Sequence, residues 1–248
     1  MLSDTSGFQN LIALLIHFNK IIPLKNNTIM KTNFLFYTII TCSLVLTSCS
    51  LDVNIDSDEI TTEERVLTSF NEIDVADDIE VIIKQGTVQS VKVTTGNDFQ
   101  KNVSTTVSGG RLTARINGSL IRSLNTLRLE ITIPTISRLI LSSDSFGTLS
   151  GFENLDTFRL KISNDASISL LSGSSNTMDI DASSEAKIEG FDFETKTCYV
   201  NCASDASVFI TCSDKLSGSV NSDAVVFYKG NPTITVSTTG DGSVVNSN

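Results

Sequence analysis

The 248-residue sequence has no tryptophan, three prolines and a single histidine, His17. Charged residues make up only 19% of the chain, so a disordered acidic tail is not its main content. The formal net charge of −10 argues against general nucleic-acid binding, which needs a basic face. Because His17 precedes the expected folded domain, that domain has no imidazole for Ser–His or Cys–His catalysis or for ligation of zinc.

An apolar, uncharged stretch over residues 33–45 follows Lys31 and has the pattern of a secretory signal. It is too short for a comfortable membrane span of about 20 residues. It ends in Leu-Thr-Ser-Cys at residues 46–49, which resembles the signal of bacterial lipoproteins. The resemblance implies that Cys49 carries a lipid and becomes the mature N-terminus. The alternative is an ordinary signal peptide, or a short buried strand that ends in cysteine.

Three segments of different composition divide the chain. We expect residues 1–48 to be a leader, with Met30 as the start of a signal of ordinary length. Residues 1–29 are then an upstream extension from a mis-assigned start, or else a genuine extension of the signal. Residues 49–64 are polar and acidic, and we expect a tether there. The folded domain is expected over residues 65–248.

From Phe70 onward, apolar and polar residues alternate along almost every segment. Clear examples lie at residues 79–83, 112–116 and 127–133. A period of two predicts β-strands with one buried face, and no window of ten or more residues shows a convincing helical period. The sequence therefore predicts an all-β domain.

A repeat of 18 to 21 residues begins at residue 137 and is the strongest pattern in the chain. Its third and eleventh positions are mostly aliphatic, and its ninth position is always small. Stacked coils place like residues above like, so the repeat predicts a parallel β-helix, or β-solenoid, with a narrow aliphatic core. Residues 65–136 lack the clean period, and we expect irregular first coils or a hairpin cap there. The units begin at Ser137, Phe158, Met178, Cys198, Leu216 and Ile234.

Each unit carries an acidic residue at its eighth position. Stacked coils lie about 4.8 Å apart, so these carboxylates would form a column in which Ca²⁺ could bridge two neighbours. The alternative is a corner position that selects residues tolerant of left-handed backbone. Beyond this column we expect no metal site, no cofactor and no catalytic residue. Its members are Asp144, Asp165, Glu185, Asp205, Asp223 and Asp241.

Three cysteines fall within the expected domain. Cys198 and Cys202 occupy positions that hold Phe, Met or Ile in other units, so we expect them in the core. Four residues apart on one strand, their Cα atoms would lie about 13 Å apart, whereas a disulfide needs less than about 7 Å. With Cys212 they make an odd number, which is a poor disulfide framework. Phe227 and Tyr228 are expected to close the end of the core, with an exposed contact patch as the alternative.

Several motifs, in order, resemble the family named "putative auto-transporter adhesin head domain". They are the opening over residues 70–75 and 79–86, the repeated Ser-Asp-Ala-Ser unit, and the ending at residues 226–232. The resemblance covers residues 66–248. It implies a right-handed parallel β-helix on exported, often lipid-anchored, bacterial proteins. Family members often carry glycine where this chain has its repeated acid.

We therefore expect an exported, lipid-anchored β-solenoid that serves the cell envelope as a structural or binding module, in adhesion or in recognition of a glycan or protein. Its expected partners are the membrane, through the lipid on Cys49, and that ligand, with no nucleic acid. The outer membrane is the expected site, and surface or periplasmic exposure and oligomeric state stay open. The alternative is a polysaccharide hydrolase or lyase, because retaining glycosidases need two carboxyls about 5–5.5 Å apart.

Overall fold

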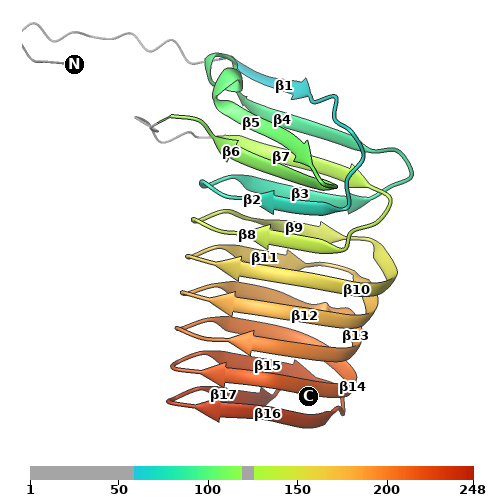
Figure 1. Cartoon of the computed structure of the whole chain (residues 1–248), viewed down its shortest axis with the longest axis vertical. Helices are drawn as coiled ribbons and strands as arrows, with labels where there is room; N and C mark the ends of the chain where they lie inside the picture. The colour runs from blue at the N-terminus through green and yellow to red at the C-terminus, as the bar shows by residue number, and fades with distance from the viewer. Residues whose placement is uncertain (1–58, 119–125) are drawn as a thin grey trace, which may run out of the picture. The chain divides into compact units, whose positions relative to one another are not determined.

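The computed structural model describes residues 59–118 and 126–248, which form one β-solenoid (Figure 1). Among the residues that the structure describes, no helix has the length and apolar character of a membrane span. The elements are β1 (Ile60–Glu64), β2 (Glu72–Val75), β3 (Glu80–Gln85), β4 (Ser90–Gly96), the 3₁₀ helix η1 (Asn97–Asn102), β5 (Val103–Ser108), β6 (Arg111–Ile116), β7 (Leu127–Ile133), β8 (Arg138–Leu141), β9 (Phe146–Ser150), β10 (Phe152–Ser163), β11 (Ser167–Leu170), β12 (Gly173–Ser183), β13 (Lys187–Cys202), β14 (Ser207–Asn221), β15 (Val225–Lys229), β16 (Thr233–Thr239) and β17 (Ser243–Asn246).

Each regular coil has two long sides and one short side. The first sheet runs from β6 through β2 and β8 to β16 and includes the C-terminal segments of β10, β12, β13 and β14. The second sheet runs from β7 through β3, β9 and β11 to β15 and β17. The short side joins them and consists of residues 152–155, 173–175, 193–195 and 211–212.

The strand register confirms the predicted repeat and the parallel β-solenoid. Third positions of the units pair in one column, in which Leu139, Leu160, Ile180 and Val200 are at most 1% exposed. The eleventh positions pair in a second column, from Gly147 to Val244. Because every coil places an apolar residue above its predecessor, the core is continuous along the stack.

One coil lies out of sequence order. Strand β2 pairs with β6 on one side and with β8 on the other, while β3 pairs with β7 and β9 in the same way. The coil over residues 72–85 is therefore inserted between two layers that come later in the chain (Figure 1). Sequence analysis did not include this coil in the repeat for two reasons. Residues 86–136 interrupt the period, and Ile79 stands at the ninth position, where the other units have a small residue.

The N-terminal layers confirm the expected hairpin cap. Antiparallel pairs join β1 to β4, β4 to β7 and β5 to β6. Gln100 of η1, 4% exposed, ties these layers together. Its Nε2 donates to Thr61 O at 2.9 Å and to Val93 O at 3.0 Å, and its Oε1 accepts from Arg65 Nη2 at 2.9 Å. The cap is therefore fixed by a buried amide as well as by strand pairing.

The expected tether needs a correction at its C-terminal end. Residues 60–64 form β1 and belong to the folded cap, since they pair with residues 92–96 of β4. Four of the five residues are exposed, so the strand is held by backbone hydrogen bonds and leaves no alternating pattern in the sequence. The expected leader over residues 1–48 and the lipid site Cys49 lie outside the described residues.

Candidate binding groove on the short side

The short side carries a column of core positions in which one large apolar side chain is followed by three smaller side chains along the stack. Leu155 of the first coil is paired with Ser175, Ser175 with Thr195, and Thr195 with Cys212. All four residues are buried, at 6%, 5%, 4% and 0% exposure. Serine and threonine fill less space than leucine, so the wall of the solenoid is thinner after the first coil.

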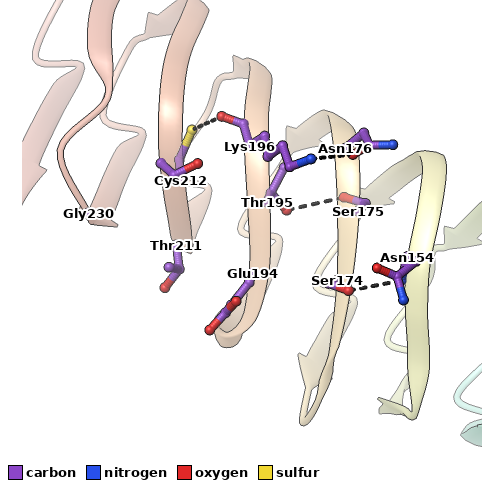
Figure 2. Close-up of a pocket in the computed structure, with 11 residues that line it drawn as sticks. Asn154, Ser174, Ser175, Asn176, Glu194, Thr195, Lys196, Thr211, Cys212 and Gly230 are labelled. Carbon is purple, nitrogen blue, oxygen red and sulfur yellow. Dashed lines mark hydrogen bonds between the residues drawn. The ribbon is translucent and has the colours of Figure 1, made fainter.

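A hollow of about 360 Å³ lies over this thinned wall, and we name it the short-side groove. Figure 2 shows that its lining residues come from neighbouring coils, one row to each coil. Their side chains offer hydroxyls, amides, a carboxylate, an ammonium group and a thiol. The lining residues are Asn154, Ser174, Ser175, Asn176, Glu194, Thr195, Lys196, Thr211, Cys212, Ser213 and Gly230.

Hydrogen bonds between coils hold the polar side chains of the groove in place. Ser175 Oγ and Thr195 Oγ1 lie 3.2 Å apart and share one hydrogen bond in the buried column. At the rim, Lys196 Nζ donates to Asn176 Oδ1 at 3.0 Å (Figure 2). Thr211 Oγ1 donates to Phe191 O at 2.7 Å. The buried hydroxyls are therefore satisfied, while the exposed Asn176, Glu194 and Lys196 keep hydrogen-bonding capacity for a ligand.

The groove suits a ligand that is rich in hydroxyl groups. Its volume falls within the range of about 300–1,000 Å³ that is usual for small-ligand sites. Donors and acceptors repeat at the coil spacing of about 4.8 Å, so a chain of similar units could make similar hydrogen bonds at successive coils. Sequence analysis missed this site. The replacement of Leu155 by Ser175 and Thr195 at the same position of later coils indicates the groove. This replacement is recognised only when the register of the short side is known.

The acidic column lies elsewhere, at the corner between the two sheets, and all six of its residues are exposed. Asp144, Asp165, Glu185 and Asp205 have φ between 59° and 63°, each after another residue with positive φ. The backbone N–H of Asp165 donates to Ser184 O of the next coil at 3.0 Å, and Asp144 and Glu185 donate in the same way at 3.0 Å. The position therefore selects residues that tolerate left-handed backbone, which favours the corner interpretation.

Within residues 59–118 and 126–248 no group of three or more His, Cys, Asp or Glu side chains could hold a metal ion. Because the carboxylates are exposed, the column also lacks the desolvated acid that a retaining glycosidase requires.

The three cysteines of the domain are free and buried, as expected for Cys198 and Cys202. Burial and the nearby Asp181 carboxylate raise the pKa of Cys202 to about 12, so its thiol is inert at neutral pH. Cys212 lies at the floor of the short-side groove. Its Sγ donates to Lys215 O at 3.0 Å and lies 3.4 Å from Lys196 O (Figure 2).

Three phenylalanines form an outward row on the second sheet that sequence analysis did not foresee. Phe209 stacks on Phe227 with ring centroids 4.7 Å apart, and Phe191 meets the edge of Phe209 at 5.5 Å. Lys229 Nζ lies 4.4 Å from the centroid of Phe191. Tyr228 is buried as expected, but Phe227 does not close the core.

Fold and groove together define a class: a β-solenoid with a polar groove that crosses several coils. Residues 69–232 match the family described as "Putative auto-transporter adhesin, head GIN domain", and the chain belongs to that family. The predicted resemblance is thus confirmed. The family description names an adhesin, which supports a binding module of the cell envelope or the extracellular space.

Two solved structures share the fold. One, described as a "putative adhesin" from Bacteroides fragilis NCTC 9343, is 16% identical with a TM-score of 0.62, and the similarity covers 77% of this chain and 98% of that one. The other, a "putative lipid binding protein" from Parabacteroides distasonis ATCC 8503, is 15% identical with a TM-score of 0.52 and coverage of 76% and 97%. No curated protein matches the sequence significantly.

Proposed function

We propose that the protein is an exported, lipid-anchored binding module whose short-side groove recognises a glycan. The observation that carries this proposal is the hollow of about 360 Å³ whose polar lining is built from consecutive coils. The family description and the name of the Bacteroides fragilis structure support a role in adhesion. A polyhydroxylated ligand matches the mixed donors and acceptors of the groove.

A glycan fits the groove better than a protein ligand does. A stable protein interface buries about 800 Å² on each partner and depends on a few buried aromatic or arginine anchors. The groove instead offers Asn176, Glu194 and Lys196 at its rim and hydroxyls at its floor. Recognition would therefore depend on hydrogen bonds that give orientation and specificity, with little contribution from stacking on aromatic rings.

The matched test uses two pairs of exposed residues on different sides of the solenoid. Asn176→Ala/Lys196→Ala removes a hydrogen-bonded pair from the groove rim, and Lys161→Ala/Asp181→Ala removes an ion pair of 3.8 Å from the first sheet. On an array of bacterial and mucosal glycans, we expect the wild-type protein to bind a defined set. The groove variant should bind that set at least about tenfold more weakly, since two polar contacts are lost.

The first-sheet variant should keep the wild-type affinity within about twofold, because exposed ion pairs contribute little and lie away from the groove. Equal affinity in the groove variant would place the binding site elsewhere on the solenoid. An array on which the wild-type protein retains no glycan would refute the glycan proposal itself.

The proposed anchor is the lipid on Cys49, and Cys42 in the same leader provides the control. Cells that express the full chain would be labelled with an alkyne fatty acid and fractionated. We expect Cys49→Ser to abolish the label and to release the protein from the membrane fraction, whereas Cys42→Ser should keep both. Labelled protein in Cys49→Ser would contradict the anchor. Protease shaving of intact and lysed cells then distinguishes a surface from a periplasmic location.

A further inference from the structure

The last layer of the solenoid consists of two edge strands. Strand β16 pairs with β14, and β17 pairs with β15, on the side that faces the rest of the stack (Figure 1). Among the residues that the structure describes, neither β16 nor β17 pairs with a strand on its other side. About half of the backbone N–H and C=O groups of both strands therefore point out of this end of the stack, as in any edge strand.

The apolar core is open at the same end. Val236 and Val244 pack against the core but are only partly buried. Ile234 lies over the buried Leu216 and is 42% exposed. Val245, which follows the outward row of phenylalanines, is 38% exposed. A partner at this end would thus extend the strand ladder and cover apolar side chains at once.

This end of the solenoid carries almost no charge. Residues 233–248 include one charged side chain, Asp241 at the exposed corner, in a chain with a formal net charge of −10. Edge strands of monomeric proteins are commonly protected from pairing by lysine, proline or an inward-pointing charge. Neither β16 nor β17 has such a residue. A second copy of this acidic chain can therefore approach its counterpart here with little electrostatic repulsion.

We propose that two copies of the protein pair end to end through β16 and β17, about a two-fold axis through the corner at residues 240–242. Strand β16 runs toward this corner and β17 runs away from it. The rotation therefore lays β16 of each copy antiparallel to β17 of the other. Residues equally distant from Asp241 face each other, so that inward Thr238 of one copy meets Val244 of the second, and outward Ser237 meets Val245. The inference depends neither on the glycan nor on the lipid anchor.

The area of the end layer is close to what a stable dimer needs. The last complete unit, from Leu216 to Ile234, has 18 residues. At about 3.3 Å per residue its perimeter is about 60 Å, and a wall about 10 Å thick then presents about 600 Å² before the core is counted. Stable interfaces bury about 800 Å² on each partner. We therefore expect a dimer that forms reversibly at micromolar concentration.

The opposite end of the solenoid is a poorer partner for this layer. It consists of antiparallel hairpins, and β1 carries Glu63 and Glu64 at exposed positions. A contact between unlike ends would also leave one edge open in every copy and would continue into a filament. The two-fold arrangement instead uses the same surface on both copies and closes after two.

Sedimentation of the purified full-length protein in a density-matched detergent tests the dimer. We expect the wild type to sediment as a dimer and Ile234→Lys/Thr238→Lys to dimerise at least about tenfold more weakly, since like charges would meet at the interface. Both residues are exposed in the single copy, so this variant should fold. Tyr199→Lys/Asn201→Lys adds the same charge at exposed positions of the first sheet, two coils before the edge, and should dimerise as the wild type does.

Disulfide trapping tests the arrangement of the two copies. Residues that face each other across antiparallel strands have Cα atoms about 4.5–5.5 Å apart, which suits a disulfide. Ser237→Cys/Val245→Cys should therefore give a covalent dimer under a mild oxidant. Each single variant should give none, because neither position faces itself. The wild type under the same oxidant provides the background, since its cysteines within the described residues are buried.

A wild-type protein that sediments as a monomer at every concentration would overturn the proposal. Equal covalent dimer from the single and double cysteine variants would overturn it as well, because the copies would then meet in another arrangement. Neither result bears on the glycan array or on the lipid label, so a failure of the dimer is distinguishable from a failure of the proposed function.

Discussion

Replacement of Gly218 with alanine is expected to prevent the last coils from stacking. Gly218 has a φ of +124°, and a Cβ at this position would lie 1.9 Å from the carbonyl oxygen of Val200 in the preceding coil. Neither strand can move away without breaking the ladder between β13 and β14. We expect a loss of about 3 kcal/mol or more of unfolding free energy, from strained backbone and steric overlap together. Thermal unfolding followed by circular dichroism measures it.

Gly109→Ala is the matched control. Gly109 also has a positive φ, of +57°, but nothing lies within 4 Å of the position that its Cβ would take. Only the backbone penalty then applies, and we expect a cost of about 1 kcal/mol. Equal melting temperatures for the two variants would show that contact between coils does not require glycine at residue 218.

Phe193→Ala should be the most damaging truncation of the core on the short side. Phe193 is 0% exposed, and its ring centroid lies 5.8 Å from that of Phe158. The ring also fills the space that a side chain on residue 173 would need, since a Cβ on Gly173 would lie 2.5 Å from Phe193 Cε2. Removal of the ring leaves a cavity, and we expect a loss of about 3–5 kcal/mol in chemical denaturation.

Phe209→Ala provides the comparison for Phe193→Ala. Phe209 is partly exposed on the second sheet and stacks on Phe227. Its truncation removes a surface pair and leaves no internal cavity, so we expect a loss of only about 0.5–1.5 kcal/mol. A larger loss for Phe209→Ala than for Phe193→Ala would mean that the outward row, and not the core, dominates the cohesion of the last coils.

The regular part of the fold could be predicted because stacking translates one coil onto the next. Once the units are aligned on Leu139, Leu160 and Ile180, strand register and core follow from the same alignment. The inserted coil could not be predicted, since its neighbours β6 and β8 both come later in the chain. Strand β1 could not be found either, because it is held by its backbone and has little buried side-chain area.

The candidate site, like the fold, could be predicted from the sequence only in part. The acidic residues lie at one corner of successive coils, and their chemistry could not be decided from the sequence, because aspartate and glycine serve equally in left-handed corners. The groove arises because small side chains replace a large one: Ser175 and Thr195 occupy the position that Leu155 occupies in the first coil. A smaller side chain is not a sequence motif. The groove could therefore be recognised only after the coils had been aligned on the short side.

The inserted coil over residues 72–85 constrains the order in which the chain can assemble. In a solenoid with sequential coils, each coil can add to its predecessor as synthesis proceeds. Here β2 and β3 are made early but gain both neighbours only after β9 is complete. The N-terminal layers must therefore close long loops before they gain stabilising contacts. The loss of chain entropy in this step slows folding. Whole coils could be added or deleted within residues 137–248, whereas the layers before them must form together.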